Sequence, residues 1–129
     1  MHLTLQCIST LIILQLLLAL NVSRLRGQTK VLSGSSDDPG DPLYKARIAH
    51  SNACEFIPAF CILMLCLQWV GAANCLGWAF RGVVLARFCH AASMLQPGRI
   101  DKPSPLRLIG AAGSVFLGLI MAGYLYCHC

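Results

Sequence analysis

Four long apolar segments alternate with short polar stretches along the chain. Residues 3–22 contain no charged side chain, and residues 106–127 are nearly as apolar. Residues 47–70 and 75–95 have a similar length but include a few polar positions. Because a helix of about 20 apolar residues spans a bilayer, the pattern predicts four transmembrane helices. Small residues that allow close helix contact recur in the last one, at Gly110, Gly113, Gly118 and Gly123.

The three connections between these segments have the composition of loops and turns. Residues 23–46 are polar and rich in Gly, Pro and Asp, which is typical of a solvated loop. Residues 71–74 are long enough only for a tight turn, and residues 96–105 contain three prolines. Without an internal repeat or a low-complexity tract, we expect one membrane domain over residues 1–129.

Composition supports a membrane protein and excludes other classes. The 129 residues are 57% hydrophobic and 12% charged, whereas a soluble domain carries about 25% charged residues. Disordered chains have low hydrophobicity and high charge, so this composition also excludes a disordered protein. The net charge of +5 rests on 10 basic residues that form no dense stripe, so no nucleic acid is expected as a partner. We therefore predict an all-α integral membrane protein, a four-helix bundle whose main partner is the lipid bilayer.

Basic residues near the ends of the segments predict the orientation in the membrane. The second connection and both chain ends contain no Lys or Arg. We therefore expect the other two connections in the cytoplasm and both termini on the opposite side. The host would be the inner membrane if the source is bacterial, and otherwise a membrane of the endoplasmic reticulum type. The basic residues of these two connections are Arg24, Arg26, Lys30, Lys45, Arg47, Arg99, Lys102 and Arg107.

The 8 cysteines do not form the pattern of a disulfide framework. Most lie in or beside the apolar segments, where they pack as small polarizable side chains. Three possible metal ligands, Cys127, His128 and Cys129, stand together at the C-terminus. Donors so close together at a chain end rarely form a closed tetrahedral site, so we expect no metal site.

Ionisable side chains inside a membrane segment mark candidate functional positions. Each costs roughly 2.5 kcal/mol or more at the centre of a membrane helix. Asn52 and Glu55 are three residues apart and share one helix face, as do Arg87 and His90. One interpretation is a buried ion pair between Glu55 and Arg87 that only fixes the helix register.

The other interpretation is a binding site for a small anion. Arg24, Arg87 and Arg107 lie near the cytoplasmic ends of their segments, with Glu55 as the only nearby carboxylate. Surplus guanidinium groups at a helix interface bind carboxylates in bidentate fashion. Arg81 lies about 240° around its helix from Arg87. We expect its long side chain to reach toward the interface in preference to binding a ligand.

Several motifs together resemble the MAPEG family (membrane-associated proteins in eicosanoid and glutathione metabolism). Residues 44–58, YKARIAHSNACEFIP, resemble the second-helix signature of that family, Arg-Ala-His/Gln-x-Asn-x-x-Glu-x-x-Pro. The acidic Gly/Pro loop before it is similar to that of the short bacterial-type members. Three other parts agree in order and spacing: Arg24-Leu25-Arg26, Arg87-Phe88-Cys89-His90 and Pro105-Leu106-Arg107.

The resemblance implies a four-helix bundle that assembles as a homotrimer and binds glutathione between subunits near the cytoplasmic face. By the family pattern, Asn52 and Glu55 would hold the peptide and amino group of glutathione. Arg107 would be the catalytic residue near the sulfur, because a nearby cation lowers the pKa of a thiol and the thiolate is the nucleophile. Arginines would meet the glutathione carboxylates, so that the binding residues are Arg24, Asn52, Glu55, Arg87 and His90.

Three functions stay open on this basis. The first is a glutathione-dependent transferase or peroxidase that acts on lipophilic electrophiles or lipid hydroperoxides. The second is a non-catalytic lipid-binding or scaffold member of the same family. It is suggested by Ile48, where the family signature has Arg, and by Met94, where the family often has Tyr. The third is a small channel or transporter subunit that uses the intramembrane arginines and Glu55.

Overall fold

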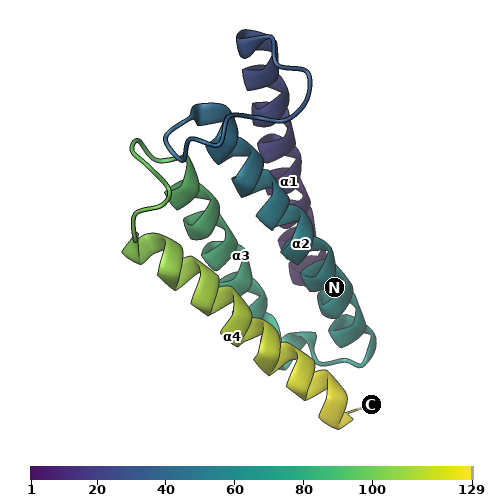
Figure 1. Ribbon diagram of the computed structural model, residues 1–129. Coiled ribbons are helices and arrows are strands. Elements are labelled where there is room, and N and C mark those ends of the chain that lie inside the picture. The colour runs from purple at the N-terminus through teal and green to yellow at the C-terminus, as the bar shows by residue number, and fades with distance from the viewer. Residues whose placement is uncertain (129) are drawn as a thin grey trace.

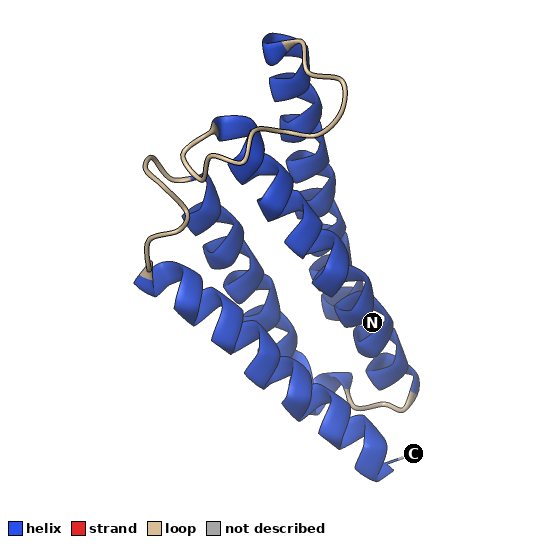
Figure 2. Ribbon diagram, in the orientation of Figure 1, coloured by secondary structure: helices blue, strands red, loops and turns tan. Residues whose placement is uncertain are grey.

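The computed structural model describes residues 1–128, which form four α-helices in an elongated bundle (Figure 1). Within this part of the chain there is no strand (Figure 2). The predicted all-α architecture with four helices is therefore confirmed. The helices are α1 (His2–Thr29), α2 (Pro42–Trp69), α3 (Ala73–Leu95) and α4 (Pro105–His128).

Local signals in the sequence set the helix boundaries. The Asp41 side chain accepts a hydrogen bond from the backbone N–H of Tyr44 at 2.7 Å, and Pro42 occupies the first turn of α2. This is a standard N-cap followed by proline. Helix α1 ends at Thr29, and the next residue, Lys30, caps it in the left-handed conformation with φ 57°. The turn between α2 and α3 contains Gly71 with φ +77°, a conformation that favours glycine.

The loop predicted over residues 23–46 is shorter than expected and covers residues 30–41. Helix α1 continues to Thr29 because residues 23–29 contain no proline, and Gly27 alone does not stop it. Helix α2 begins early because its cap and proline precede the apolar segment. Backbone hydrogen bonds set where a helix ends, so a helix can extend beyond its apolar segment.

Helix α1 packs mainly against α2, and α3 packs mainly against α4 (Figure 1). Contacts between α2 and α3 hold these two pairs together. We call the end with residues 30–41 and 96–104 the loop end, and the end with residues 70–72 the turn end. Thr4 Oγ1 donates to Gln68 Oε1 at 2.7 Å, so the N-terminus lies at the turn end. Helix α4 also ends there (Figure 1).

The core contains apolar side chains from all four helices. Because lipid tails are as apolar as these side chains, close packing and hydrogen bonds hold such helices together in a membrane. The core is thus a set of fitted contacts between helices. The largest of its fully buried apolar side chains are Leu11, Ile57, Met64, Leu67, Phe80, Val83 and Met121.

Helices α3 and α4 approach each other closely at Gly110. A Cβ atom at this position would lie 2.7 Å from the backbone nitrogen of His90 and 2.8 Å from the backbone oxygen of Ala86. Only glycine allows this approach, as the small residues of the last segment led us to expect. At Gly123, by contrast, a Cβ would have no neighbour within 4 Å among the described residues.

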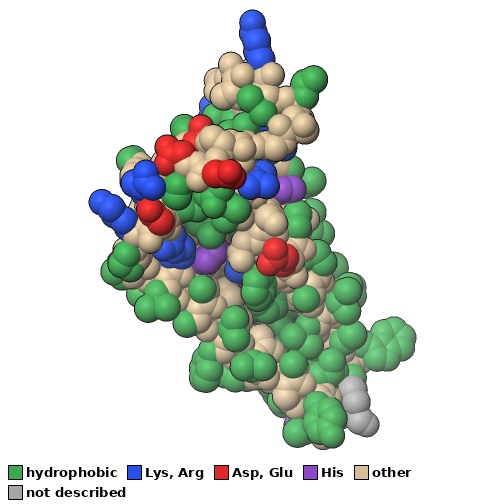
Figure 3. Space-filling model, in the orientation of Figure 1, with side chains coloured by type: hydrophobic (Ala, Val, Ile, Leu, Met, Phe, Trp, Pro, Cys, Tyr) green, Lys and Arg blue, Asp and Glu red, His purple; other side chains and the backbone are tan. Residues whose placement is uncertain are grey.

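Three helices, α1, α2 and α4, are long and apolar enough to cross a membrane. Helix α3 has 23 residues but falls outside this group, since Arg81, Arg87 and His90 lower its apolar character. Charged side chains gather at the loop end, and apolar side chains cover most of the remaining surface in view (Figure 3). The bundle thus has the surface of a membrane protein with one polar end.

The contact at Gly110 gives a prediction for stability. Gly110→Ala should lower the thermal unfolding midpoint in detergent, because overpacking against backbone costs about 1–3 kcal/mol. Gly123→Ala is the matched control and should leave the midpoint unchanged or raise it, since alanine favours helix. Tryptophan fluorescence during heating measures both. Equal shifts in the two variants would contradict the close approach of α3 and α4.

Candidate functional site

Arg87 on α3 is the centre of a polar cluster inside the loop-end half of the bundle. Its side chain is 2% exposed, and one Nη donates to Asn52 Oδ1 on α2. The guanidinium carbon also lies 5.0 Å from the centre of the Phe56 ring, a cation–π distance. Its Nε is buried and has no hydrogen-bond partner within residues 1–128. This buried cation therefore has a donor left for a further acceptor.

Glu55 does not form the buried ion pair with Arg87 that the sequence allowed. Both ion pairs found within residues 1–128 belong to Arg99. Glu55 is exposed, and its Oε1 accepts a 3.5 Å hydrogen bond from Ser51 Oγ. Asn52, one turn earlier, faces α3 instead and takes the place of the carboxylate. The interpretation of an ion pair that fixes helix register is therefore wrong for the single chain.

His90 lies one turn after Arg87 on α3 and is 6% exposed. Its Nδ1 is 3.3 Å from the backbone oxygen of Arg107 on α4. A carbonyl oxygen only accepts, so Nδ1 carries the proton of this bond. The buried Nε2 has no partner in the described part of the chain. In the neutral ring this nitrogen is a free acceptor close to the start of α4.

Arg107 is turned toward the loop that joins α3 and α4. Its Nη1 donates to the backbone oxygen of Ile100, and its Nη2 donates to that of Lys102 at 2.7 Å. The side chain is only partly exposed. Both terminal nitrogens therefore bind the 96–104 loop, so the position of the Arg107 side chain depends on the position of that loop.

An open pocket of about 630 Å³ lies beside His90 and Arg107. This volume is within the range of small-molecule sites, about 300–1,000 Å³, and such sites combine apolar walls with a few polar groups. The two basic side chains are such groups, and the other walls are Pro103, Ser104, Pro105, Leu108 and Ala111.

Arg24 is separate from this cluster. It is exposed near the end of α1, where its Nη2 donates to Asn21 Oδ1 at 3.2 Å. It lines a different pocket of about 400 Å³ together with Lys45 and Leu95. The single chain thus brings Asn52 to Arg87 and His90 to Arg107, but it leaves Arg24 and Glu55 on its surface.

Lys45 has a structural role that its place among the basic residues near the membrane ends did not reveal. It is 8% exposed, and its Nζ donates to the backbone oxygens of Gln96 at 3.0 Å and Gly98 at 3.1 Å. The signal that could have revealed it is its position four residues before the buried Ala49, on the inner face of α2. Lys45 therefore ties the start of α2 to the loop that Arg107 also holds.

No group of three or more possible metal ligands occurs within residues 1–128. The C-terminal group of Cys127, His128 and Cys129 is not tested by this result, because Cys129 lies outside the described residues. His128 Nδ1 is 2.9 Å from the backbone oxygen of Tyr124, and the two rings stack.

The two hydrogen bonds of Lys45 give a second prediction. Lys45→Met should loosen residues 96–104, so that trypsin cleaves after Arg99 severalfold faster in the folded, detergent-purified protein. Lys30→Met, which removes an exposed charge at the end of α1, is the control and should leave this rate unchanged. Mass spectrometry of the fragments measures the cleavage. Equal rates in wild type and Lys45→Met would show that Lys45 does not hold the loop.

Comparison with known proteins agrees with this structure. The family model of the MAPEG family matches residues 4–127, nearly the whole chain. No curated protein and no solved structure matches this chain. With its apolar helices, the match shows a multi-pass membrane protein. The chain therefore belongs to the MAPEG family, whose members are membrane four-helix bundles.

Proposed function

We propose that this protein is a membrane-embedded, glutathione-dependent transferase or peroxidase that acts on lipophilic electrophiles or lipid hydroperoxides. The MAPEG family includes such enzymes as well as non-catalytic members. The observation that carries the proposal is the buried guanidinium of Arg87. It is held by Asn52 and Phe56 from α2, and its Nε is free to meet an acceptor.

The charges around Arg87 fit the chemistry of glutathione. Glutathione has two carboxylates, one ammonium group and one thiol. Arg87 offers a charged donor to a carboxylate, and a bond to a charged group is stronger than one between neutral groups. The exposed carboxylate of Glu55, one turn along α2 from Asn52, is available for the ammonium group. His90 adds a buried acceptor nitrogen on the same face of α3 as Arg87.

The site is incomplete in one chain, which supports the proposal of a homotrimer. Arg24 is exposed and has only Asn21 as a side-chain partner within residues 1–128. In a trimer, Arg24 of a neighbouring subunit would reach the second carboxylate of glutathione. Glu55 would then lie between subunits instead of facing lipid, where a charge is costly. We further propose that the loop end is cytoplasmic.

Arg107 is the proposed catalytic residue. Bound glutathione would supply a thiol whose thiolate form is the nucleophile. Arg107 would stabilise that negative charge in one of two ways. It would use its Nε, or a terminal nitrogen that has released its bond to the 96–104 loop. The neighbouring pocket of about 630 Å³ has the volume for the lipophilic substrate. His90 would keep Arg107 in place through the hydrogen bond to its backbone oxygen.

A second candidate function, a non-catalytic lipid-binding or scaffold protein, is favoured by other observations. Both terminal nitrogens of Arg107 are occupied by loop carbonyls. Ile48 packs against the core where the family signature has Arg, and Met94 is 8% exposed where the family often has Tyr. Neither apolar side chain can bind a carboxylate or a thiolate. Glutathione binding and turnover distinguish the two functions.

The first functional prediction concerns glutathione binding. Equilibrium dialysis of the detergent-purified protein should show binding that Arg87→Gln weakens about tenfold or more, because a hydrogen bond to a charged group contributes roughly 1.5–3 kcal/mol. Arg81→Gln removes the same charge from another face of α3 and should leave binding unchanged. Absence of binding at millimolar glutathione would overturn the proposal and favour the non-catalytic function.

The second functional prediction concerns Arg107. Arg107→Ala should lower turnover of glutathione with a chlorodinitrobenzene or a lipid hydroperoxide by about 100-fold or more, the usual effect of removing one group that stabilises a reacting charge. Glutathione binding and the size-exclusion profile should persist. Lys102→Ala, a neighbouring charge, is the control. Unchanged turnover in Arg107→Ala would remove Arg107 from the catalytic role.

A further inference from the structure

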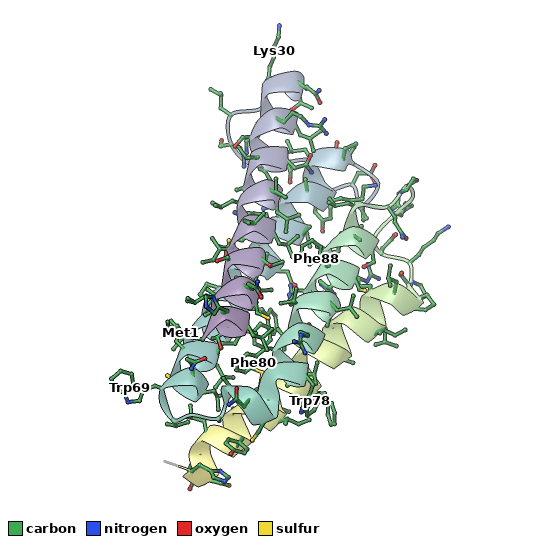
Figure 4. All side chains as sticks on the ribbon, turned by 180° about the vertical axis from the view of Figure 1, so that it is seen from behind. Met1, Lys30, Trp69, Trp78, Phe80 and Phe88 are labelled. Atoms are coloured by element: carbon green, nitrogen blue, oxygen red, sulfur yellow. The ribbon has the colours of Figure 1, made fainter. Side chains whose placement is uncertain are left out.

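Arg81 lies in a groove that the proposed glutathione site does not use. The groove has a volume of about 330 Å³ and runs between α1 and α3. Leu3, Cys7 and Thr10 of α1 form one wall, and Val84 and Phe88 of α3 form part of the other, beside Arg81. Figure 4 views the molecule from this side, with Phe88 labelled beside α3. The groove is therefore mostly apolar and contains one charged side chain, the guanidinium of Arg81.

The guanidinium of Arg81 is not neutralised by the chain. Arg81 is exposed, and it makes no hydrogen bond or ion pair with another side chain in the part that the structure describes. The helices that form the groove, α1 and α3, contain no Asp or Glu. Thr10 Oγ1 already donates to the backbone oxygen of Gln6. An unpaired cation on a lipid-facing surface is unfavourable, so this groove favours an anionic occupant.

The position of Arg81 along α3 indicates which anion. Arg81 stands eight residues after Ala73, where α3 begins, which is about 12 Å along the axis. Helical side chains point back toward the N-terminus of their helix, so we expect the guanidinium to extend toward the turn end. In a bilayer, the phosphates of one leaflet would lie beyond that end of the helix, within reach of a long arginine side chain. From Arg81 to Phe88 the groove continues inward for about 10 Å, along the direction of an acyl chain.

We propose that the groove between α1 and α3 binds one anionic phospholipid of the leaflet at the turn end. Arg81 holds the lipid phosphate, for which the planar guanidinium offers two parallel N–H donors. The side-chain amide of Gln6, exposed on the other side of the groove, is the second polar contact. Val84 and Phe88 line the part of the groove that takes an acyl chain. Arg81 thus has a lipid ligand in addition to its reach toward the interface.

A second copy of this chain fits the groove less well. The only carboxylate within the predicted spans is Glu55 on α2, which the proposed function assigns to the glutathione site. The remaining acidic residues, Asp37, Asp38, Asp41 and Asp101, belong to the loop end, whereas the α1 wall of the groove lies in the first turns of that helix, at the turn end. Membrane lipid is the anion source at the right depth.

Native mass spectrometry of the purified full chain tests the proposal. The probes are phosphatidylglycerol and phosphatidylcholine with identical acyl chains, added in equal amounts. Wild type should retain phosphatidylglycerol at least tenfold more than phosphatidylcholine. Arg81→Gln should lose this preference, and Arg81→Lys should keep part of it, because lysine has the charge without the fork. Lys30→Gln removes an exposed charge at the loop end and should bind like wild type.

A second variant separates the groove from general charge effects. Val84→Trp places bulk in the groove without changing charge and should reduce retention of both lipids, while size exclusion and glutathione binding stay as in wild type. Equal retention of phosphatidylglycerol in wild type and Arg81→Gln would overturn the proposal. So would an equal loss in Lys30→Gln. Displacement of the phospholipid by equimolar oleate would instead assign the groove to a fatty-acid carboxylate, and the proposal of a phospholipid site would be wrong.

Discussion

A guanidinium buried among apolar helices is the constraint that sets the arrangement of the bundle. Arg87 is 2% exposed, and a buried charge is tolerated only when it is well paired or hydrogen-bonded. Its partners, Asn52 and Phe56, both come from α2. These contacts fix the rotation and the height of α2 against α3. Apolar contacts alone would leave both less well defined, because many apolar faces pack about equally well in lipid.

The contact between α3 and α4 connects the buried part of the bundle to the loop end. Gly110 brings the two backbones together at His90, and His90 then reaches the backbone of Arg107. Arg107 in turn holds residues 96–104, which Lys45 holds from the side of α2. A continuous series of short contacts thus connects the buried Arg87 to the polar loop. The candidate site is built on helices, and the side chain of its proposed catalytic residue, Arg107 of α4, is hydrogen-bonded to the loop before that helix.

Helix α3 deals with two intramembrane arginines in different ways. Arg87 faces the interior and is partnered by the protein, whereas Arg81 faces a groove and is left to the surroundings. They are six residues apart, so they project from different faces. One helix can therefore carry both the proposed internal ligand site and the proposed external lipid contact, because the two arginines project from different faces.

The sequence by itself determined the four helices, the small residues along the last of them, and the three-residue spacing of Asn52 with Glu55 and of Arg87 with His90. Periodicity within one helix is enough for these, since residue spacing fixes which side chains share a face. Only the tertiary structure decided that Asn52 meets Arg87 while Glu55 stays exposed, and that Lys45 is buried. The reason is that spacing does not specify which face meets which neighbour; the helix crossings and the short 30–41 loop decide that.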